Sequence, residues 1–266
     1  MLLSDIFLIH SRQLTTISII TAVFNSASTV CDCIEGAKSQ SVQPEHIFVD
    51  GGSTDGTLDI LRGPGSVIAK VVSEPDNGVY DALNKGIALA TGEVIGILHG
   101  DDTYADREVL SRVERAFEDN HVDSCYGDLV YVDREKTERI VRRWCSGAYD
   151  VRRFYWGWMP PHPTFFVRRK IYEKFGGFNL SFGTAADYEL MLRFLVKHRI
   201  SSVYIPAILV KMRIGGLSNI SFMNRLRANR MDRKAWREND LKPLPFTHIL
   251  KPLSKVGQYV MTGSGG

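Results

Sequence analysis

The feature that most constrains the fold is an alternation of short apolar segments with helical patterns over the first hundred residues. Buried strands are predicted at residues 16–22, 47–49, 67–72 and 94–98. Between these strands, apolar side chains recur at helical spacing over residues 28–39 and 79–90. Strands that alternate with helices predict an α/β fold with a mostly parallel central sheet flanked by helices.

The second half of the chain is less regular than the first. Strands are predicted at residues 125–132, 139–144, 202–205 and 208–213, and helices at 168–175 and 186–197. A Trp- and Pro-rich segment, residues 154–166, precedes the first of these helices. No internal repeat and no long linker divides the chain. The sequence therefore predicts one compact domain followed by a C-terminal extension.

Polar side chains follow three of the predicted strands in the first half. Asn25, Asp50 and the pair Asp101–Asp102 each come directly after an apolar segment. Open α/β sheets bind their ligands beyond the carboxyl ends of the strands. A single Asp in such a place also suits a turn or a helix start. Acidic residues at several strand ends are harder to explain as turns alone, so we expect a ligand site at this edge.

The segment that begins at Asp50 reads Asp-Gly-Gly-Ser-Thr-Asp-Gly-Thr. Its glycines would let the backbone turn sharply and approach a ligand closely. The spacing matches neither a P-loop nor a dinucleotide fingerprint. The carboxylate of Asp50 would repel phosphate but could accept a hydrogen bond from a nucleobase or a ribose. A tight turn between a strand and a helix explains the same glycines.

The pair Asp101–Asp102 is the better candidate for a metal site. Mg²⁺ and Mn²⁺ prefer oxygen ligands and are commonly held by one or two carboxylates together with substrate phosphates. A metal ion held here could bridge a nucleoside diphosphate and neutralise the charge that develops as it leaves. The alternative is a solvated acidic turn that caps the following helix.

Positive charge is concentrated near the C-terminus. Residues 1–210 carry 22 Lys and Arg against 27 Asp and Glu, whereas residues 211–266 carry 11 against 3. A basic tail on a mildly acidic body predicts a polyanionic partner. Residues 246–260 also place apolar side chains on one helical face, which is typical of interfacial helices, although Pro252 would interrupt a helix. The alternative is a solvated helix packed on the domain.

Other sequence features indicate the cellular compartment. No apolar run approaches the roughly 20 residues that a membrane-spanning helix needs. Asp5 interrupts the apolar N-terminus, and no cleavage site for a signal peptide follows. The four cysteines fit neither a disulfide framework nor a zinc pattern. We therefore expect a cytoplasmic protein with reduced thiols.

Five separated blocks occur in an order that resembles family 2 of the glycosyltransferases, and bacterial exopolysaccharide and colanic-acid-type members in particular. The blocks are ISIITAVFNSAST, HIFVDGGSTDGT, SEPDNGVYDALNKGIALATGEVIGILHGDD, HPTFFVRR and GTAADYELMLRF. The resemblance covers about residues 15–220 and implies the GT-A fold. It further implies a nucleotide-binding half at 15–105 and an acceptor half at 106–220, which leaves 221–266 as a basic amphipathic extension.

The resemblance implies that a nucleotide-sugar donor is held at the strand ends. The matching donor-binding positions are Ala22, Phe24, Asn25, Asp50, Ser53, Asp55, Asp76, Gly78, Asp81, Lys85 and Asp101. Asp50 would hydrogen-bond the base, and Asp101 would contact ribose or sugar. Lys85 could reach a phosphate or be a screened residue on a helix surface. Asp102 would bind Mn²⁺ or Mg²⁺, with Asp101 and His162 as further candidate ligands.

The resemblance also implies that Asp187 is the catalytic base. The first turn of a helix favours an Asp whatever its function, and the family often has Glu-Asp where this chain has Ala186-Asp187. The resemblance places Trp158 and His162 near the acceptor or the leaving diphosphate. Both could instead be packed loop residues, because aromatic side chains dominate core burial generally.

The implied activity is inverting transfer of a sugar by direct displacement, with UDP-sugar as the family-weighted donor. A glycan or a polyprenyl-diphosphate-linked acceptor is expected, in cell-surface polysaccharide synthesis. An anionic membrane surface is a further expected partner, at the cytoplasmic face of the inner membrane, and no nucleic acid is expected. The alternatives are a noncatalytic nucleotide-sugar- or carbohydrate-binding protein and a nucleotidyltransferase. The second is disfavoured because residues 21–28 contain neither Gly nor a basic residue.

Overall fold

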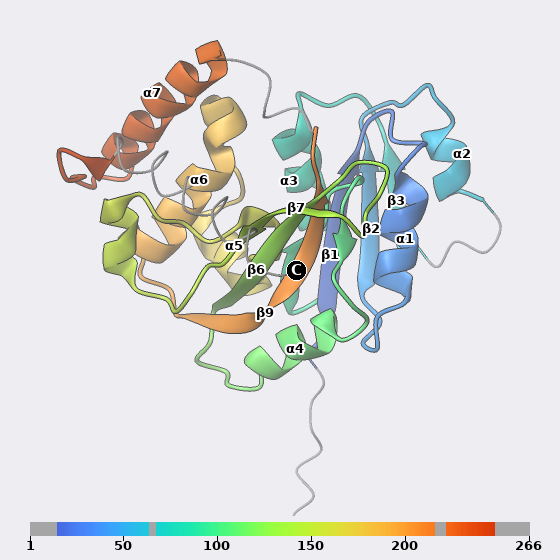
Figure 1. The fold of residues 1–266 in the computed structure, drawn as a ribbon, viewed down its shortest axis with the longest axis horizontal. Coiled ribbons are helices and arrows are strands. Elements are labelled where there is room, and N and C mark those ends of the chain that lie inside the picture. Colours follow the sequence, from blue (N-terminus) through green and yellow to red (C-terminus); the bar gives the residue numbers. More distant parts are fainter. Residues whose placement is uncertain (1–14, 64–67, 216–221, 248–266) are drawn as a thin grey trace, which may run out of the picture.

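The computed structural model of the chain describes residues 15–63, 68–215 and 222–247, without the side chains of 222–229. One sheet of nine strands runs through these residues in the order β3-β2-β1-β4-β8-β6-β9-β5, and β7 pairs with β6. Figure 1 shows β1–β3 with α1 and α2 on one side of the molecule and α5–α7 gathered on the other. The sheet therefore joins the two halves that the sequence suggests.

The first half is the predicted alternation of parallel strands and helices. Its elements are β1 (Ile17–Val23), α1 (Val30–Lys38), β2 (Glu45–Asp50), α2 (Thr57–Leu61), β3 (Lys70–Ser73), α3 (Val79–Leu89) and β4 (Val94–Ile97). In the parallel register, Val23 lies beside Asp50, and Asp50 lies beside Ser73. The carboxyl ends of these strands therefore meet at one edge of the sheet.

The second half mixes parallel and antiparallel strands. Its strands are β5 (Thr103–Tyr104), β6 (Ser124–Val132), β7 (Ile140–Trp144), β8 (Phe166–Arg168) and β9 (Ser202–Arg213). Its α-helices are α4 (Val109–Ala116), α5 (Arg169–Phe175), α6 (Ala186–Met191) and α7 (Phe222–Glu238). The shorter helical elements are η1 (Val151–Trp156), η2 (His162–Thr164), η3 (Leu180–Ala185) and the π-helical η4 (Leu192–Lys197).

One predicted break in this half is wrong. The two strands expected at 202–205 and 208–213 form the single strand β9. Its pairing with β6 shifts register between Tyr126 and Asp128, where Tyr204 and Ile208 are the successive partners. A bulge of this kind accommodates Pro206, because proline has no N–H to donate to the ladder.

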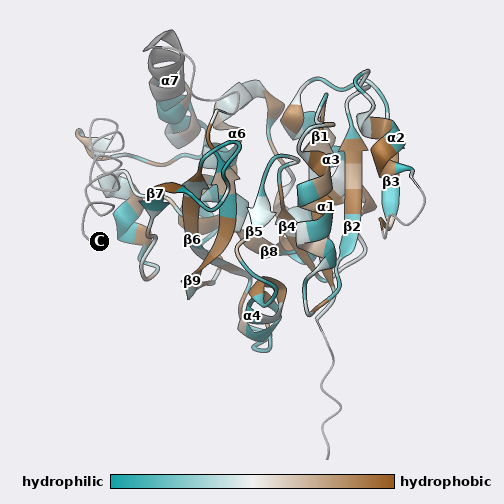
Figure 2. Ribbon diagram, turned by 45° about the vertical axis from the view of Figure 1, so that its right-hand side comes forward, coloured by the Kyte–Doolittle hydropathy of each residue, from teal (hydrophilic) through white to brown (hydrophobic). Residues whose placement is uncertain are grey.

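The core follows the central strands. Ile19, Ile20 and Ile95 are fully buried, because helices cover both faces of the sheet in this part of the fold. Figure 2 shows hydrophobic residues concentrated in strands such as β6 and β9, and hydrophilic residues along α1 and α4. Helix α3 packs very close to β1, since a Cβ on Gly86 would lie 2.3 Å from Ile20 Cγ2. This contact fixes α3 and places its first turn at the sheet edge.

The C-terminal extension begins with α7, which packs on the domain. The Trp236 side chain is fully buried, and its Nε1–H donates to the Tyr188 hydroxyl at 2.9 Å. Residues 248–266, where most of the predicted amphipathic face falls, lie outside the described residues. Within the part of the chain that is described, every helix is too short or too polar to span a bilayer.

Candidate functional site

The Gly-rich loop after β2 is held to the end of β1 by Asn25. The Asn25 N–H donates to the Ser53 hydroxyl at 2.8 Å, and Thr54 N–H donates to Asn25 Oδ1 at 2.9 Å. Asn25 has a positive φ of 49°, a conformation that Asn tolerates better than most residues. Asp55 continues the connection, because Ala27 N–H donates to it at 3.0 Å. These hydrogen bonds fix the shape of the loop, and the donor-binding roles expected of Asn25, Ser53 and Asp55 stay predictions.

The carboxylate of Asp50 is buried beneath this loop. The Asp50 side chain is 0% exposed. It accepts hydrogen bonds from the hydroxyl of Ser53, from the Ser73 hydroxyl at 2.6 Å and from the backbone N–H groups of Gly52 and Ser53. Both carboxylate oxygens therefore have partners inside the protein. The structure buries the Asp50 side chain, and its predicted contact with a base stays a prediction.

Asp76 occupies the surface position above Asp50. Its Oδ1 accepts a hydrogen bond from Gly78 N–H at 2.8 Å. A Cβ built on Gly51 would lie 2.6 Å from Asp76 Oδ2 and 3.4 Å from the Phe24 ring. The carboxylate of Asp76 thus fills the space of a side chain at position 51, at the carboxyl end of β2. The Phe24 ring beside it is 64% exposed.

Lys85 and Asp81 hold the segment that carries Asp76. Lys85 Nζ lies 2.8 Å from a Glu74 carboxylate oxygen and donates to the Pro75 carbonyl at 3.0 Å. The hydrogen bond with Glu74 is the main reason that the pKa of Lys85 is raised. Asp81 accepts a hydrogen bond from Asn77 N–H at 2.9 Å. In the described structure both residues organise the loop.

The Asp101–Asp102 turn presents two very different carboxylates. The Asp102 side chain is 0% exposed, whereas Asp101 is partly exposed. Asp102 Oδ1 accepts from Arg213 N–H at 3.2 Å, and its Oδ2 has no hydrogen-bond partner among the described residues. Burial, aided by the charge of Asp101, raises the pKa of Asp102 well above its usual value. Of the two, only Asp101 has a side chain that solvent reaches.

Arg213 fixes this turn from the end of β9. Its guanidinium donates to the Asp101 carbonyl at 2.8 Å, to the Arg134 carbonyl at 3.2 Å and to the carboxylate of Asp32 on α1. The Arg213 side chain is 6% exposed, whereas its partner Asp32 is 57% exposed, so the guanidinium reaches from the interior to the surface of α1. The sequence does not single out Arg213, because its partners lie far away along the chain.

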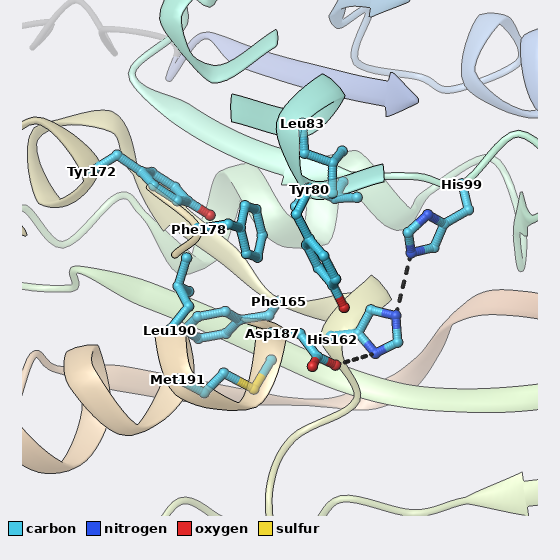
Figure 3. Close-up of a pocket in the computed structure, with 11 residues that line it drawn as sticks. Tyr80, Leu83, His99, His162, Phe165, Tyr172, Phe178, Asp187, Leu190 and Met191 are labelled. Carbon is cyan, nitrogen blue, oxygen red and sulfur yellow. Dashed lines mark hydrogen bonds and ion pairs between the residues drawn. The ribbon is translucent and has the colours of Figure 1, made fainter. Parts of the chain in front are cut away.

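Asp187 lies in a cavity near the end of β4. Its Oδ2 is 3.3 Å from His162 Nδ1, and its Oδ1 accepts a hydrogen bond from Tyr188 N–H at 2.7 Å. Tyr80, from the first turn of α3, lines the same cavity. Figure 3 shows the Tyr80 hydroxyl and the His162 ring both facing this carboxylate. His162 and the Tyr188 N–H therefore hold the predicted base, with the Tyr80 hydroxyl beside it.

His99 extends this contact into a chain of three groups. His99 Nε2 lies 3.3 Å from His162 Nε2, as the dashed line in Figure 3 marks. Burial, with a smaller effect of His162, lowers the pKa of His99 to about 3, so His99 is neutral at physiological pH. One neutral arrangement satisfies all contacts: His99 Nε2–H donates to His162 Nε2, and His162 Nδ1–H donates to Asp187.

The cavity is otherwise lined by apolar and aromatic side chains. Its walls are Tyr80, Leu83, Ile97, His99, His162, Phe165, Tyr172, Phe178, Asp187, Leu190 and Met191. Burial, and secondarily the negative charge of Asp187, raises the pKa of Tyr80 well above its usual value. The Tyr80 hydroxyl therefore stays protonated and remains a donor. The sequence reveals neither Tyr80 nor His99, although His99 directly follows an apolar strand as the predicted ligands do.

Trp158 is part of the core packing next to this cavity. Its indole N–H donates to the Ser146 carbonyl at 3.0 Å. Its ring meets those of Phe154 and Tyr126 edge-on, at centroid distances of 5.3 and 5.8 Å. The structure therefore gives Trp158 a packing role beside the predicted acceptor site. Ala22, by contrast, is partly exposed at the end of β1, near the donor edge.

The residues present at the strand ends fit a divalent ion that also takes phosphate oxygens. No group of three or more His, Cys, Asp or Glu side chains within the described ranges could hold a metal alone. Asp101 is partly exposed, and the neighbouring Asp102 has a buried oxygen, Oδ2, that has no hydrogen-bond partner among the described residues. The turn can therefore offer one or two carboxylates to a metal ion. Mg²⁺ and Mn²⁺ are commonly bound by such a set when the substrate supplies phosphates.

Comparison with known proteins agrees with this geometry. Residues 18–176 match the model of the family described as glycosyl transferase family 2. An uncharacterised glycosyltransferase of Mycobacterium tuberculosis is 33% identical over 184 residues, which are 67% of this chain and 68% of that protein. A PGL/p-HBAD biosynthesis glycosyltransferase of Mycobacterium bovis is 33% identical over 216 residues, which are 76% of this chain and 78% of that protein.

Solved structures with low sequence identity share the fold. Staphylococcus aureus TarS 1–349 in complex with UDP-GlcNAc superposes with a TM-score of 0.68 at 16% identity, over 84% of this chain and 66% of that one. The mannosyltransferase PcManGT from Pyrobaculum calidifontis, in complex with GDP-Man and Mn²⁺, gives a TM-score of 0.62 at 18% identity, over 95% and 76%. The chain has the GT-A fold, as expected.

Proposed function

The chain belongs to glycosyl transferase family 2, and from this premise we propose that it transfers a sugar from a nucleoside-diphosphate donor to an acceptor hydroxyl that Asp187 deprotonates. The observation that carries the proposal is the contact of Asp187 with His162, Tyr188 N–H and Tyr80. A carboxylate held in one orientation inside a mostly apolar cavity is suited to general-base catalysis. Among the described residues, Asp187 is the one carboxylate that lines this cavity, which favours inversion by direct displacement.

In this mechanism the reacting groups are positioned by the chain itself. Asp187 takes the proton of the acceptor hydroxyl, whose oxygen then forms the bond to the anomeric carbon as the bond to the nucleoside diphosphate breaks. His162 and the Tyr188 N–H each contact one oxygen of the carboxylate, which fixes its orientation, and the Tyr80 hydroxyl lies beside it. The apolar cavity walls exclude water that would compete for the sugar.

We propose that Asp76 and Phe24 bind the nucleobase of the donor, a role that the sequence prediction gave to Asp50. Asp76 Oδ2 lies at the surface over Gly51, next to the exposed ring of Phe24. A ring and a carboxylate side by side can stack on a base and accept a hydrogen bond from its edge. In this proposal Asp50 does not contact the nucleobase but stabilises the loop by accepting hydrogen bonds from Ser53 and Ser73. UDP stays the expected nucleotide.

We assign the divalent ion, Mn²⁺ or Mg²⁺, primarily to Asp101. Asp102 had this role in the sequence prediction, but its burial leaves Asp101 as the carboxylate that a diphosphate could share. When bound, the ion would neutralise negative charge on the leaving diphosphate. Arg213 holds the Asp101 carbonyl and so fixes the direction in which its side chain leaves the turn. His162 contacts Asp187 and His99, which supports a role beside the base.

The acceptor is proposed as a glycan or a polyprenyl-diphosphate-linked glycan of cell-surface polysaccharide synthesis, on the cytoplasmic side of the membrane. The names of two relatives support a glycan or lipid-linked acceptor. One is a PGL/p-HBAD biosynthesis glycosyltransferase. The other is the chondroitin synthase of Pasteurella multocida, which is 22% identical over 187 residues. That second match spans 69% of this chain and 19% of that protein.

A panel of nucleotide sugars tests the proposal. We expect one UDP-, GDP- or dTDP-sugar to raise the thermal unfolding temperature in the presence of Mn²⁺ and to be consumed slowly, with water as acceptor. The same panel with EDTA is the control, and stabilisation should fall there. Stabilisation without any turnover, with or without added acceptors, would instead identify a noncatalytic nucleotide-sugar-binding protein.

A further inference from the structure

One outer face of the acceptor half exposes large apolar side chains. Trp156 is 61% exposed and Phe246 64%, and Leu244 between α7 and Phe246 is 41% exposed. Trp156 ends η1, and the other two follow α7, so two distant segments contribute. We call these three residues the outer apolar patch. Exposed aromatic residues that gather on one face mark interaction surfaces more often than single ones do.

The patch rests on a rigid base. The Thr247 side chain is 1% exposed, and its hydroxyl donates to the Tyr155 carbonyl at 2.6 Å. The Tyr155 ring packs on the buried ring of Trp236 with centroids 5.0 Å apart. Phe246 and Trp156 are each the direct neighbour of a residue in this hydrogen bond. The two segments are therefore fixed side by side, with Trp156 and Phe246 left in solvent.

The segment that carries Leu244 and Phe246 has an excess of positive charge. Residues 230–247 contain five Lys and Arg against three Asp and Glu. Two of these acids already have cationic partners, since Glu238 lies 3.6 Å from Lys234 and Asp240 lies 3.1 Å from Lys197. The third acid, Asp232, is buried. The exposed cations Arg233, Arg237 and Lys242 thus lie on the same stretch of chain as two of the three patch residues.

We propose that the outer apolar patch docks the protein on an anionic lipid bilayer. Trp, Phe and Leu flanked by Lys and Arg are the side chains that enter the headgroup region while cations bind acidic lipids. A second copy of the chain fits less well, because an isologous contact would place the same cations opposite one another. The proposal concerns residues 156 and 244–246, and it requires nothing of residues 248–266.

The patch is connected to α6, the helix that carries the proposed base. Trp236, beneath Tyr155, donates to the hydroxyl of Tyr188, which directly follows Asp187. Docking would therefore place the acceptor half, with Asp187, towards the lipid surface. A lipid-linked acceptor would meet the base at that side. The docking itself does not depend on sugar transfer, so donor binding can persist when membrane binding fails.

Vesicle binding of the full chain tests the proposal. The protein is sedimented with vesicles of phosphatidylcholine alone and of phosphatidylcholine mixed with phosphatidylglycerol. We expect binding to the mixed vesicles only, and a drop in the partition coefficient of at least about tenfold in the double variant Trp156→Ser/Phe246→Ser. The matched control is Ile140→Ser/Val141→Ser, which removes two exposed apolar residues from β7 (37% and 36% exposed) and should bind like wild type.

Two further measurements keep the result decisive. The Trp156→Ser/Phe246→Ser variant should unfold near the wild-type temperature, because both replaced side chains are more than half exposed, and circular dichroism checks that both variants are folded under the assay conditions. Trp156→Phe should retain binding but lose most of the blue shift in tryptophan fluorescence that vesicles induce. Wild-type binding by the Trp156→Ser/Phe246→Ser variant would assign lipid binding to another segment and overturn the proposal. So would equal binding to both vesicles, no binding by wild type, or a dimer in light scattering that this variant abolishes.

Discussion

Asp187→Asn is expected to slow sugar transfer by at least about a thousandfold while donor affinity stays unchanged. A general base contributes about 10²–10⁴ in rate, and an amide of the same shape cannot take the proton. The neighbours His162 and Tyr188 N–H can still hold the side chain in place. The donor loop lies on other elements, so binding should survive. The measurement is kcat in a transfer assay together with a donor Kd from calorimetry.

Two companion variants sharpen this result. Tyr80→Phe removes the polar hydroxyl that faces Asp187 but leaves the carboxylate, so we expect a loss of about tenfold. Asp59→Asn is the matched control, because Asp59 also lies in the first turn of a helix but is exposed on α2. It should transfer at the wild-type rate. Near-wild-type transfer by Asp187→Asn would remove Asp187 as the base.

The second large effect is expected at Asp101. Asp101→Asn should lower Mn²⁺-dependent turnover at least about a hundredfold, because it weakens the one solvent-accessible carboxylate at this turn. Asp102→Asn should cost much less, since burial raises the pKa of Asp102 and so favours its neutral form, which an amide resembles. The measurement is the Mn²⁺ titration of turnover for each variant.

Comparing the Mn²⁺ response of the Asp101→Asn and Asp102→Asn variants identifies which carboxylate binds the ion. Circular dichroism on both variants serves as the folding control, because Asp102 lies in the interior near Arg213. If Asp102→Asn abolishes the Mn²⁺ response and Asp101→Asn keeps it, the buried carboxylate is the ligand, as the sequence had suggested. Arg213 would then organise the ligand directly.

The sequence predicts the first half of the fold well because its signal is local. Apolar segments such as residues 94–98 are stable only when buried, and in the helices between them apolar side chains recur every three to four residues. The short strands β5 and β8 are missed because two or three residues are too few to show an alternation of apolar and polar side chains. The strand pair near Pro206 is split because proline usually ends a strand, and only the register with β6 shows that β9 continues.

The sequence places the candidate residues at strand ends but does not reveal how deeply their side chains are buried. Asp50 and Asp102 follow strands as expected, yet both carboxylates are buried. The sequence does not reveal this, because whether a side chain after a strand turns inward or outward depends on distant partners. For Asp50 those partners include Ser73, and for Asp102 they include Arg213.

Contacts far apart along the chain are the part that sequence reasoning cannot supply. Gly51 and Asp76 are complementary only because β3 brings the loop after it beside the end of β2. His99, His162 and Asp187 meet because β4 and β8 are neighbours in the sheet. The resemblance to the family names Asp187 and His162 separately, whereas the structure joins them.

The configuration of the released sugar tests the central claim most directly. With an α-linked nucleotide sugar as donor and water as acceptor, proton NMR reports the first anomer formed, before mutarotation. Asp187 as the one carboxylate among the described residues that line the cavity predicts the β-anomer. Release of the α-anomer from the wild-type enzyme would contradict direct displacement and the assigned role of Asp187.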